Sequence, residues 1–204
     1  MKQVTPREVG QLKSILSARR NLKLKISQRQ KEILIGTILG DAYISPLGKI
    51  QIEHSSKYKT YIEWKFYELK NLSYKKISYT ERVNKQRNKK YSSYRFWLRQ
   101  YFRPWREYFY QGKMKIFPEK LKLSPLSLAV WYMDDGCYSD ERCTLSTESF
   151  NNTSLLIIKN KLKLLGIDTY IRSNGKLGIN AKSQNHFFTL IKPHIHEDML
   201  YKLS

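Results

Sequence analysis

Two short apolar segments of the sequence each end on a carboxylate, and together they offer the paired acids that a divalent cation needs. The first runs from Leu34 to Ala42 with its acid at Asp41, and the second from Leu128 to Gly136 with its acid at Asp135. Neighbouring carboxylates are typical ligands of Mg²⁺. One helix-terminal Asp would be an ordinary residue, but the repetition of the whole context favours a shared metal site.

Capping signals predict that both segments are helices. Ser27 to Gln30 has the Ser-x-x-Gln form of a capping box, so a helix is expected to begin there and to end near Gly40. Ser124-Pro125 marks the second start, because proline is tolerated at the first helical position.

Gly36 and Gly40 share one face of the first helix, because they are four residues apart. Small residues let a partner helix approach closely, and we expect the partner to be the other repeat helix. That packing would bring Asp41 and Asp135 together, where a bound cation would relieve their repulsion.

The segments that follow the two helices also repeat. Each half continues with a strand pair, an amphipathic helix, a second strand pair and a closing helix, and Asp41 and Asp135 are 94 positions apart. The sequence therefore predicts an α+β fold of two pseudo-symmetric αββαββα subdomains with two central packed helices. The expected boundaries are a basic N-terminal arm over 1–26, a first subdomain over 27–112, a linker over 113–124 and a second subdomain over 125–204.

The charge of the chain predicts a nucleic-acid partner. Its 204 residues contain 38 Lys plus Arg against 17 Asp plus Glu, a formal net charge of +21. The sequence has no apolar run of transmembrane length and no signal segment after Met1, and only two cysteines, which we interpret as reduced thiols. We expect no membrane partner and an intracellular protein of an organelle (mitochondrion or chloroplast) or of a bacterial cytoplasm, because the abundance of Lys, Ile, Asn and Tyr is typical of an AT-rich genome.

Two segments concentrate the basic residues. Residues 1–31 carry nine Lys or Arg against one acid, and residues 75–106 carry eleven against one. The stretch from Lys2 to Lys31, with Arg19, Arg20, Lys23 and Lys25, is expected to bind phosphates rather than to read bases. Base reading is expected from polar side chains that alternate outward on the strands. These are Lys49, Gln51, Glu53, Arg82, Asn84, Arg95 and Arg99 in the first half and Arg142, Thr144, Ser146, Arg172, Asn174, Lys176 and Asn180 in the second.

Both acidic segments resemble the nine-residue signature of LAGLIDADG homing endonucleases, and the doubled unit covers nearly the entire chain. Gly-Asp-Ala-Tyr at 40–43 and Trp-Tyr-Met-Asp-Asp-Gly at 131–136 resemble the single-chain, two-motif branch that includes the yeast mitochondrial omega-intron enzyme. The resemblance implies that Asp41 and Asp135 hold the catalytic metals, with neighbouring backbone carbonyls from Gly40 and Asp134.

The same branch carries two further lysines. The resemblance places one at Lys115, in Lys-Ile-Phe-Pro at 115–118, with Lys113 as a near alternative, and the other at Lys202. If Ser204 is the native end, Lys202 is expected to be frayed. Val130 stands where the family signature has a small glycine, which predicts a wider helix crossing on that side.

The resemblance implies a site-specific endonuclease that makes a double-strand break in a long asymmetric DNA target and leaves 3′ overhangs. Mg²⁺ is the expected cofactor, with Mn²⁺ as a substitute and Ca²⁺ as an ion that binds without supporting cleavage. We expect a monomer, because the two halves differ at nearly every outward position.

Other functions fit the same pattern. Some members of the family are intron RNA maturases and some relatives bind DNA without cleaving it, and a structural ribonucleoprotein component would explain the charge but not the repeat. Retention of both acids favours a nuclease, since a pure binding module has little reason to place carboxylates against phosphates. Tyr132 to Asp135 also matches the tetrapeptide of reverse-transcriptase palms. We interpret that match as coincidence, because an apolar helix precedes it and the chain is short.

Overall fold

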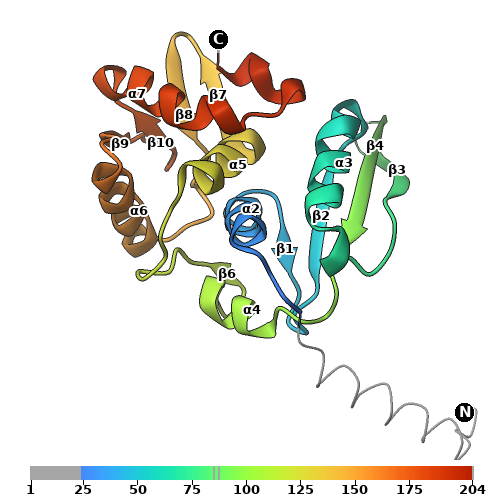
Figure 1. Cartoon of the computed structure of the whole chain (residues 1–204). Coiled ribbons are helices and arrows are strands. Elements are labelled where there is room, and N and C mark those ends of the chain that lie inside the picture. Colours follow the sequence, from blue (N-terminus) through green and yellow to red (C-terminus); the bar gives the residue numbers. More distant parts are fainter. Residues whose placement is uncertain (1–23, 85, 87, 204) are drawn as a thin grey trace, which may run out of the picture.

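A computed structural model describes residues 24–84, 86 and 88–203 of the chain (Figure 1). The first half consists of α2 (Gln28–Leu39), β1 (Tyr43–Ile44), β2 (Ile50–Ser55), α3 (Lys59–Glu68), β3 (Ser78–Asn84), β4 (Lys89–Trp97) and α4 (Arg103–Phe109). The second half consists of α5 (Pro125–Asp135), β7 (Gly136–Ser139), β8 (Arg142–Leu145), α6 (Asn152–Leu164), β9 (Thr169–Ile171), β10 (Leu177–Ile179) and α7 (Ala181–Ile191). Each half is an αββαββα unit, so the predicted α+β fold is confirmed.

Short elements join and flank the two units. The 3-10 helices are η1 (Ser56–Tyr58), η2 (Lys70–Leu72), η3 (Lys192–His194) and η4 (Glu197–Lys202). A small hairpin of β5 (Tyr110–Gln111) and β6 (Met114–Lys115) lies at the start of the predicted linker, which is therefore partly structured.

The two sheets have the same topology. The first has the strand order β1-β2-β4-β3 and the second β7-β8-β10-β9, and all neighbouring strands are antiparallel. The same order in both halves is the structural counterpart of the repeat in the sequence. The α2 and α5 helices lie side by side at the centre, between the two sheets (Figure 1).

Caps and small residues fix the central helix pair. Ser27 and Gln30 form the predicted capping box at α2, and Ser124 forms one with Ser127 at α5. Each cap contributes about 0.5–2 kcal/mol to stability. A Cβ on Gly36 would lie 2.6 Å from the Cβ of Val130, so the glycine accommodates the larger residue opposite. The helices approach closely here rather than standing apart as Val130 had suggested.

One face of each sheet covers the core. In the first half Ile50, Ile52 and Phe96 pack with Ile62 of α3, and all four are fully buried. Burial of each such side chain stabilises the fold by about 1.5–3 kcal/mol. The predicted apolar stripes lie in this core: Ile62, Leu69, Leu155, Ile158 and Leu162 are buried, while Tyr58, Phe66 and Leu165 are partly buried.

Most of the predicted basic arm, residues 1–23 with Arg19, Arg20 and Lys23, lies outside the described residues. Cys137 is exposed and Cys143 is buried, and both are free thiols, as predicted. Within the described part of the chain, no helix is both long and apolar enough to cross a membrane.

Candidate active site

The carboxyl-terminal ends of α2 and α5 meet and bring the acids of the two halves together. Asp41 follows α2, and Asp134 and Asp135 are the last two residues of α5. The two halves also approach closely at Gly40, where an added Cβ would lie 2.5 Å from the Cβ of Asp134. Only glycine permits this approach, because a side chain would overlap Asp134. The predicted pairing of the two helices and their acids is therefore present in the fold.

Asp41 and Asp135 lie in different electrostatic environments. Burial acts to raise the pKa of Asp41, but His54, Lys65 and Lys202 outweigh it and the pKa falls below its ordinary value. The Asp41 side chain is still 42% exposed, so solvent screens part of this effect. Burial raises the pKa of Asp135 to about 7, with further contributions from the negative charges of Asp41 and Asp134. A bound cation would stabilise the ionised form of Asp135, which burial and the neighbouring carboxylates destabilise.

Two of the predicted lysines stand beside these acids. Lys115 Nζ donates to the carbonyl oxygen of Gly40 at 2.7 Å, whereas Lys113 is exposed. Lys202 is buried rather than frayed, and its Nζ donates to the carbonyl oxygens of Met133 at 2.6 Å and Asp134 at 3.3 Å. Burial lowers the pKa of both lysines, although the nearby carboxylates oppose the change.

The donor set suits a hard divalent cation. Lys115 and Lys202 contact carbonyl oxygens, which leaves the carboxylates of Asp41 and Asp135 available. A carbonyl oxygen has two lone pairs, so Gly40 and Asp134 could each accept from a lysine and still face a cation. Carboxylate and carbonyl oxygens are the ligands that Mg²⁺, Ca²⁺ and Mn²⁺ prefer.

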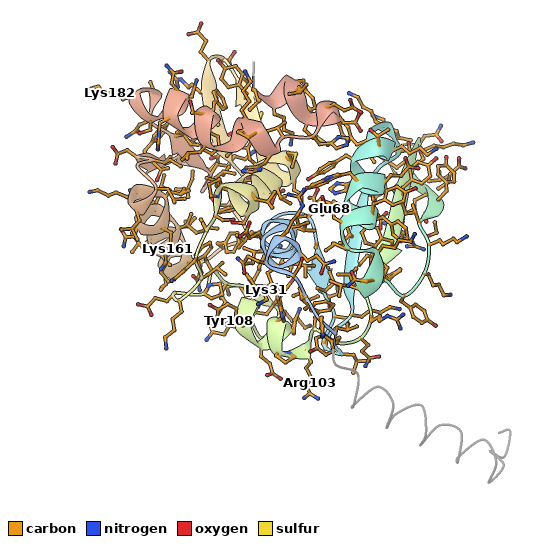
Figure 2. The ribbon with its side chains drawn as sticks, in the orientation of Figure 1. Lys31, Glu68, Arg103, Tyr108, Lys161 and Lys182 are labelled. Carbon is orange, nitrogen blue, oxygen red and sulfur yellow. The ribbon has the colours of Figure 1, made fainter. Side chains whose placement is uncertain are left out.

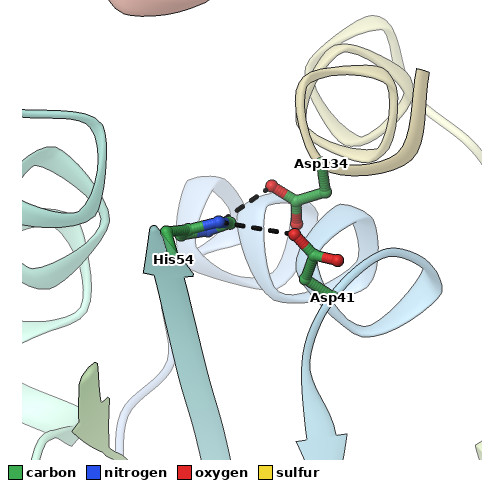
Figure 3. Close-up of side chains that lie close together, drawn as sticks. All are labelled: Asp41, His54 and Asp134. Atoms are coloured by element: carbon green, nitrogen blue, oxygen red, sulfur yellow. Dashed lines mark ion pairs between the residues drawn. The ribbon is translucent and has the colours of Figure 1, made fainter. Parts of the chain in front are cut away.

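A third acid and a histidine complete the cluster (Figure 3). The ligand atoms of Asp41, His54 and Asp134 lie within 4.8 Å of one another. His54, at the end of β2, points between the two carboxylates: Nδ1 is 3.4 Å from Asp41 Oδ2, and Nε2 is 3.6 Å from Asp134 Oδ1. Lys65 Nζ already contacts two members of this group, Asp134 and His54, so a side-chain cation occupies this part of the cluster.

His54, Tyr61 and Lys65 also belong to the site but were not predicted, because the sequence carries only weak signals of their role. His54 is the polar residue on the buried face of β2, where Ile50 and Ile52 precede it. Lys65 lies within the apolar stripe of α3 and is fully buried. A buried lysine requires a partner of opposite charge, but the sequence alone does not say where that partner lies.

Beside the acids is a cavity of about 280 Å³. Its lining includes Asp41, His54 and Asp134 from the cluster, and Glu53 from the adjacent strand face. Tyr58 and Tyr201 close one side, where their hydroxyl groups are 2.8 Å apart. The cluster therefore lines a cavity that can admit a ligand.

The sheet register places the predicted base readers of the first half on one face. Gln51 pairs with Trp97, Glu53 with Arg95, and Arg82 with Tyr91, so these side chains share the face opposite the core. Lys49 continues the same alternation and lies over the rings of Trp97 and Tyr74, at 4.6 and 5.4 Å. Asn84 pairs with Lys89 at the outer end of β3, and Arg99 follows β4 and is exposed.

Several of these side chains bind one another. Glu53 accepts from Ser93 at 2.6 Å, from Gln51 at 2.7 Å and from Arg82 at 3.2 Å. Ser93 lies on the same face and was not predicted. The face is therefore an organised polar surface, in which Glu53 is already satisfied by its neighbours.

The corresponding face of the second half is less polar than predicted. Arg142, Arg172 and Asn174 are exposed, and Ser146 is partly buried. Thr144 is buried, contrary to its predicted outward exposure, and its hydroxyl group is 3.5 Å from the Cys137 carbonyl oxygen. By register Thr144 pairs with Gly178, whose missing side chain leaves room for the ring of Tyr170 on this face.

Two more predicted readers in this half, Lys176 and Asn180, are only partly exposed. Lys176 Nζ is 3.4 Å from Glu148 Oε1. Asn180 is the N-cap residue of α7 and is partly buried. The placement of these side chains does not test whether they contact DNA, so base reading by both halves stays a prediction.

Two αββαββα units that share a helix pair, with acids at the crossing and polar strand faces on both sides, define a pseudo-symmetric endonuclease fold. The chain belongs to the LAGLIDADG DNA endonuclease family, whose model matches residues 31–187. This confirms the family that the two acidic segments indicated and the endodeoxyribonuclease class predicted with it.

Two relatives that are named as endonucleases agree with this assignment. The chain is 33% identical over 107 residues to "Intron-encoded endonuclease ai4" of Dictyostelium discoideum, covering 48% of this chain and 67% of that protein. It is 27% identical to "DNA endonuclease I-ChuI" of Chlamydomonas applanata, covering 89% of this chain and 97% of the relative. It spans only about half, 47%, of a "Protein RecA" of Mycolicibacterium flavescens.

A solved structure extends the likeness to three dimensions. The homing endonuclease I-WcaI, bound to its DNA recognition sequence, matches with a TM-score of 0.81 and 27% identity. The match covers 98% of this chain and 95% of that one. The two-unit architecture is thus shared over nearly the full length.

Proposed function

We propose that the protein is a site-specific homing endonuclease that makes a double-strand break in a long, asymmetric DNA target and leaves 3′ overhangs. The observation that carries the proposal is the meeting of Asp41 with Asp134 and Asp135 at the crossing of α2 and α5, beside two lysines. The family and the DNA-bound relative support it.

Asp41 and Asp135 would hold Mg²⁺, with the carbonyl oxygens of Gly40 and Asp134 as further ligands. When bound, the ion would supply activation of water and stabilisation of the leaving 3′ oxygen. Lys115 and Lys202 would fix those carbonyl groups and place positive charge where the scissile phosphate lies. Mn²⁺ is expected to substitute for Mg²⁺, and Ca²⁺ to bind without supporting cleavage.

The two strand faces would lie along the DNA. Their outward side chains would read bases, and the basic excess of the chain would bind phosphates. Because the faces differ, with Arg82 and Arg95 in one and Gly178 and Tyr170 in the other, the target would be asymmetric and the active species a monomer. An organelle or a bacterial cytoplasm is the proposed compartment, in keeping with relatives named as intron-encoded.

Cleavage of a plasmid library with randomised targets tests this proposal. Asp41→Asn and Asp135→Asn should each abolish cleavage in Mg²⁺ and retain duplex binding in Ca²⁺, while Asp140→Asn, a change in an exposed turn, should retain both. Cleavage by both active-site variants would overturn the nuclease assignment. Tighter binding to intron RNA than to any DNA duplex would favour a maturase. A stable dimer in sedimentation would overturn the proposed monomeric state.

A further inference from the structure

At the crossing of α2 and α5, the second half carries one more acid than the first half. Gly40 precedes Asp41 in the first half, whereas Asp134 precedes Asp135 in the second, and these two positions face each other across the helix crossing. The Asp134 side chain has no exposed surface. A buried carboxylate beside two other acids needs a compensating charge from elsewhere in the fold.

That charge comes from the first half. Lys65, on α3, is fully buried, and its Nζ lies 2.7 Å from both carboxylate oxygens of Asp134. Tyr61, one turn earlier on α3, donates its hydroxyl group to Asp134 Oδ1 at 2.8 Å. Three hydrogen bonds from one helix therefore occupy most of the acceptor sites of the Asp134 carboxylate.

Lys65 also determines the state of His54. Its Nζ is 3.1 Å from His54 Nε2, and an ammonium group has donors only, so Nε2 must accept. The ring proton then lies on Nδ1, which faces Asp41 Oδ2 at 3.4 Å. The three donors of Lys65 are all used, and a continuous chain of contacts runs from Asp134 through Lys65 and His54 to Asp41.

We propose that Lys65 is a positioning residue of the nuclease site: a built-in cation that neutralises Asp134 and, through His54, orients Asp41 toward the bound ion. This inference rests on the proposed function for its effect on cleavage, but not for the state of His54. Partners that orient metal ligands typically change metal affinity or activity by about 10- to 100-fold when they are removed.

Cleavage kinetics give the first test. Lys65→Met should slow single-turnover cleavage by about 10- to 100-fold, because it leaves Asp134 unpaired and frees it to compete for the ion. The double variant Lys65→Met/Asp134→Asn removes both charges and should recover most of the folding stability and part of the rate. Lys59→Met, an exposed lysine on the same helix, should match the wild type.

The nitrogen NMR shifts of the His54 ring give a second test, made on metal-free protein. The wild type should carry its proton on Nδ1, and Lys65→Met should move it to Nε2, which then faces Asp134 Oδ1. Tyr61→Phe, which keeps the lysine, should leave the Nδ1 proton in place. A structural role alone would lower the melting temperature without changing the tautomer.

These outcomes separate the two proposals. A wild-type Nε2 proton, or a tautomer that Lys65→Met does not change, would overturn the positioning role even if the wild type cleaves DNA. Unchanged cleavage by a folded Lys65→Met variant would overturn it as well. A wild type that cuts no sequence of the randomised library would overturn the nuclease function, while the His54 result would still decide the role of Lys65.

Discussion

Asp198 of η4 caps the helix that carries Tyr61, although the two residues belong to different halves of the chain. Its Oδ2 accepts from the Thr60 hydroxyl group at 2.5 Å and from the Tyr61 backbone N–H at 3.0 Å. Tyr58 and Tyr201 stack beside this contact, with ring centroids 6.1 Å apart. The η4 helix, whose last residue is Lys202, therefore joins the second half to α3.

Asp198→Ala should weaken this junction. Loss of an N-cap acceptor costs about 0.5–2 kcal/mol, so the free energy of unfolding should fall by about that amount in urea denaturation. The cleavage rate should fall by more than this loss of folding stability explains, because Lys202 loses part of its support. Glu197→Ala, at the neighbouring position, is the matched control. A loss of stability with the wild-type cleavage rate would show that Lys202 is positioned independently of this contact.

Gly40→Ala tests the close approach of the two halves. The added Cβ would lie 2.5 Å from the Cβ of Asp134, which Lys65 and Tyr61 hold in place. Overpacking of this kind typically costs about 1–3 kcal/mol, and the shift would also separate the acids. We expect a lower melting temperature and a lower cleavage rate, whereas Gln28→Ala, at an exposed and uncharged position of α2, should change neither. Wild-type values for the Gly40→Ala variant would mean that the helices can move apart freely.

Local patterns were sufficient to predict most of this fold. The Ser27 and Ser124 caps and the spacing of Gly36 and Gly40 each encode local geometry, and all lie where expected. Lys115 and Lys202 were predicted from the resemblance to the family rather than from their spacing in the sequence. Their contacts with Gly40 and Met133 join residues that are far apart in sequence.

The features that could not be predicted from the sequence depend on contacts between residues that are far apart in the chain. Lys65 interrupts an apolar stripe, and its significance depends on Asp134, 69 residues later. Thr144 alternates correctly on β8, but Gly178 and Tyr170 on neighbouring strands determine that it is covered. Periodicity identifies the face on which a side chain lies, whereas burial depends on what the rest of the chain places above it.

The raised pKa of Asp135 predicts a pH dependence of the metal-free protein. Its folded pKa of about 7 exceeds the ordinary value of 3.8, so between these values the folded chain binds a proton that the unfolded chain lacks. The contribution of Asp135 to the free energy of unfolding therefore falls as the pH rises from about 4 to about 7. In EDTA, Asp135→Asn should gain stability relative to the wild type between pH 5 and pH 8.

Asp140→Asn is the control, because that acid lies in an exposed turn. The lowered pKa of Asp41 acts in the opposite sense, since its contribution is present above the ordinary value and is lost only as the pH falls through the lower, folded value. A difference between Asp135→Asn and the wild type that stays constant from pH 5 to pH 8 would contradict the raised pKa.

Arg95 is the strand residue most suited to read a base. It lies on the outward face opposite Glu53 and Ser78, and its buried Nε has no hydrogen-bond partner among the described residues. An unpaired buried donor is costly in the free protein, whereas the rest of the partly exposed guanidinium group offers further N–H donors that a base edge or phosphate in the groove would accept. Arg95→Met should therefore weaken binding to the preferred duplex by about 1–3 kcal/mol and relax specificity at one position.

Arg103→Met controls for the loss of charge, because Arg103 projects from α4 into solvent and is 76% exposed (Figure 2). Fluorescence anisotropy with the preferred duplex and with single-base variants, at several salt concentrations, separates two kinds of contact. A base contact predicts a loss confined to one position of the target. An equal loss for all sequences, with a salt slope reduced by about one, would instead assign Arg95 to a phosphate.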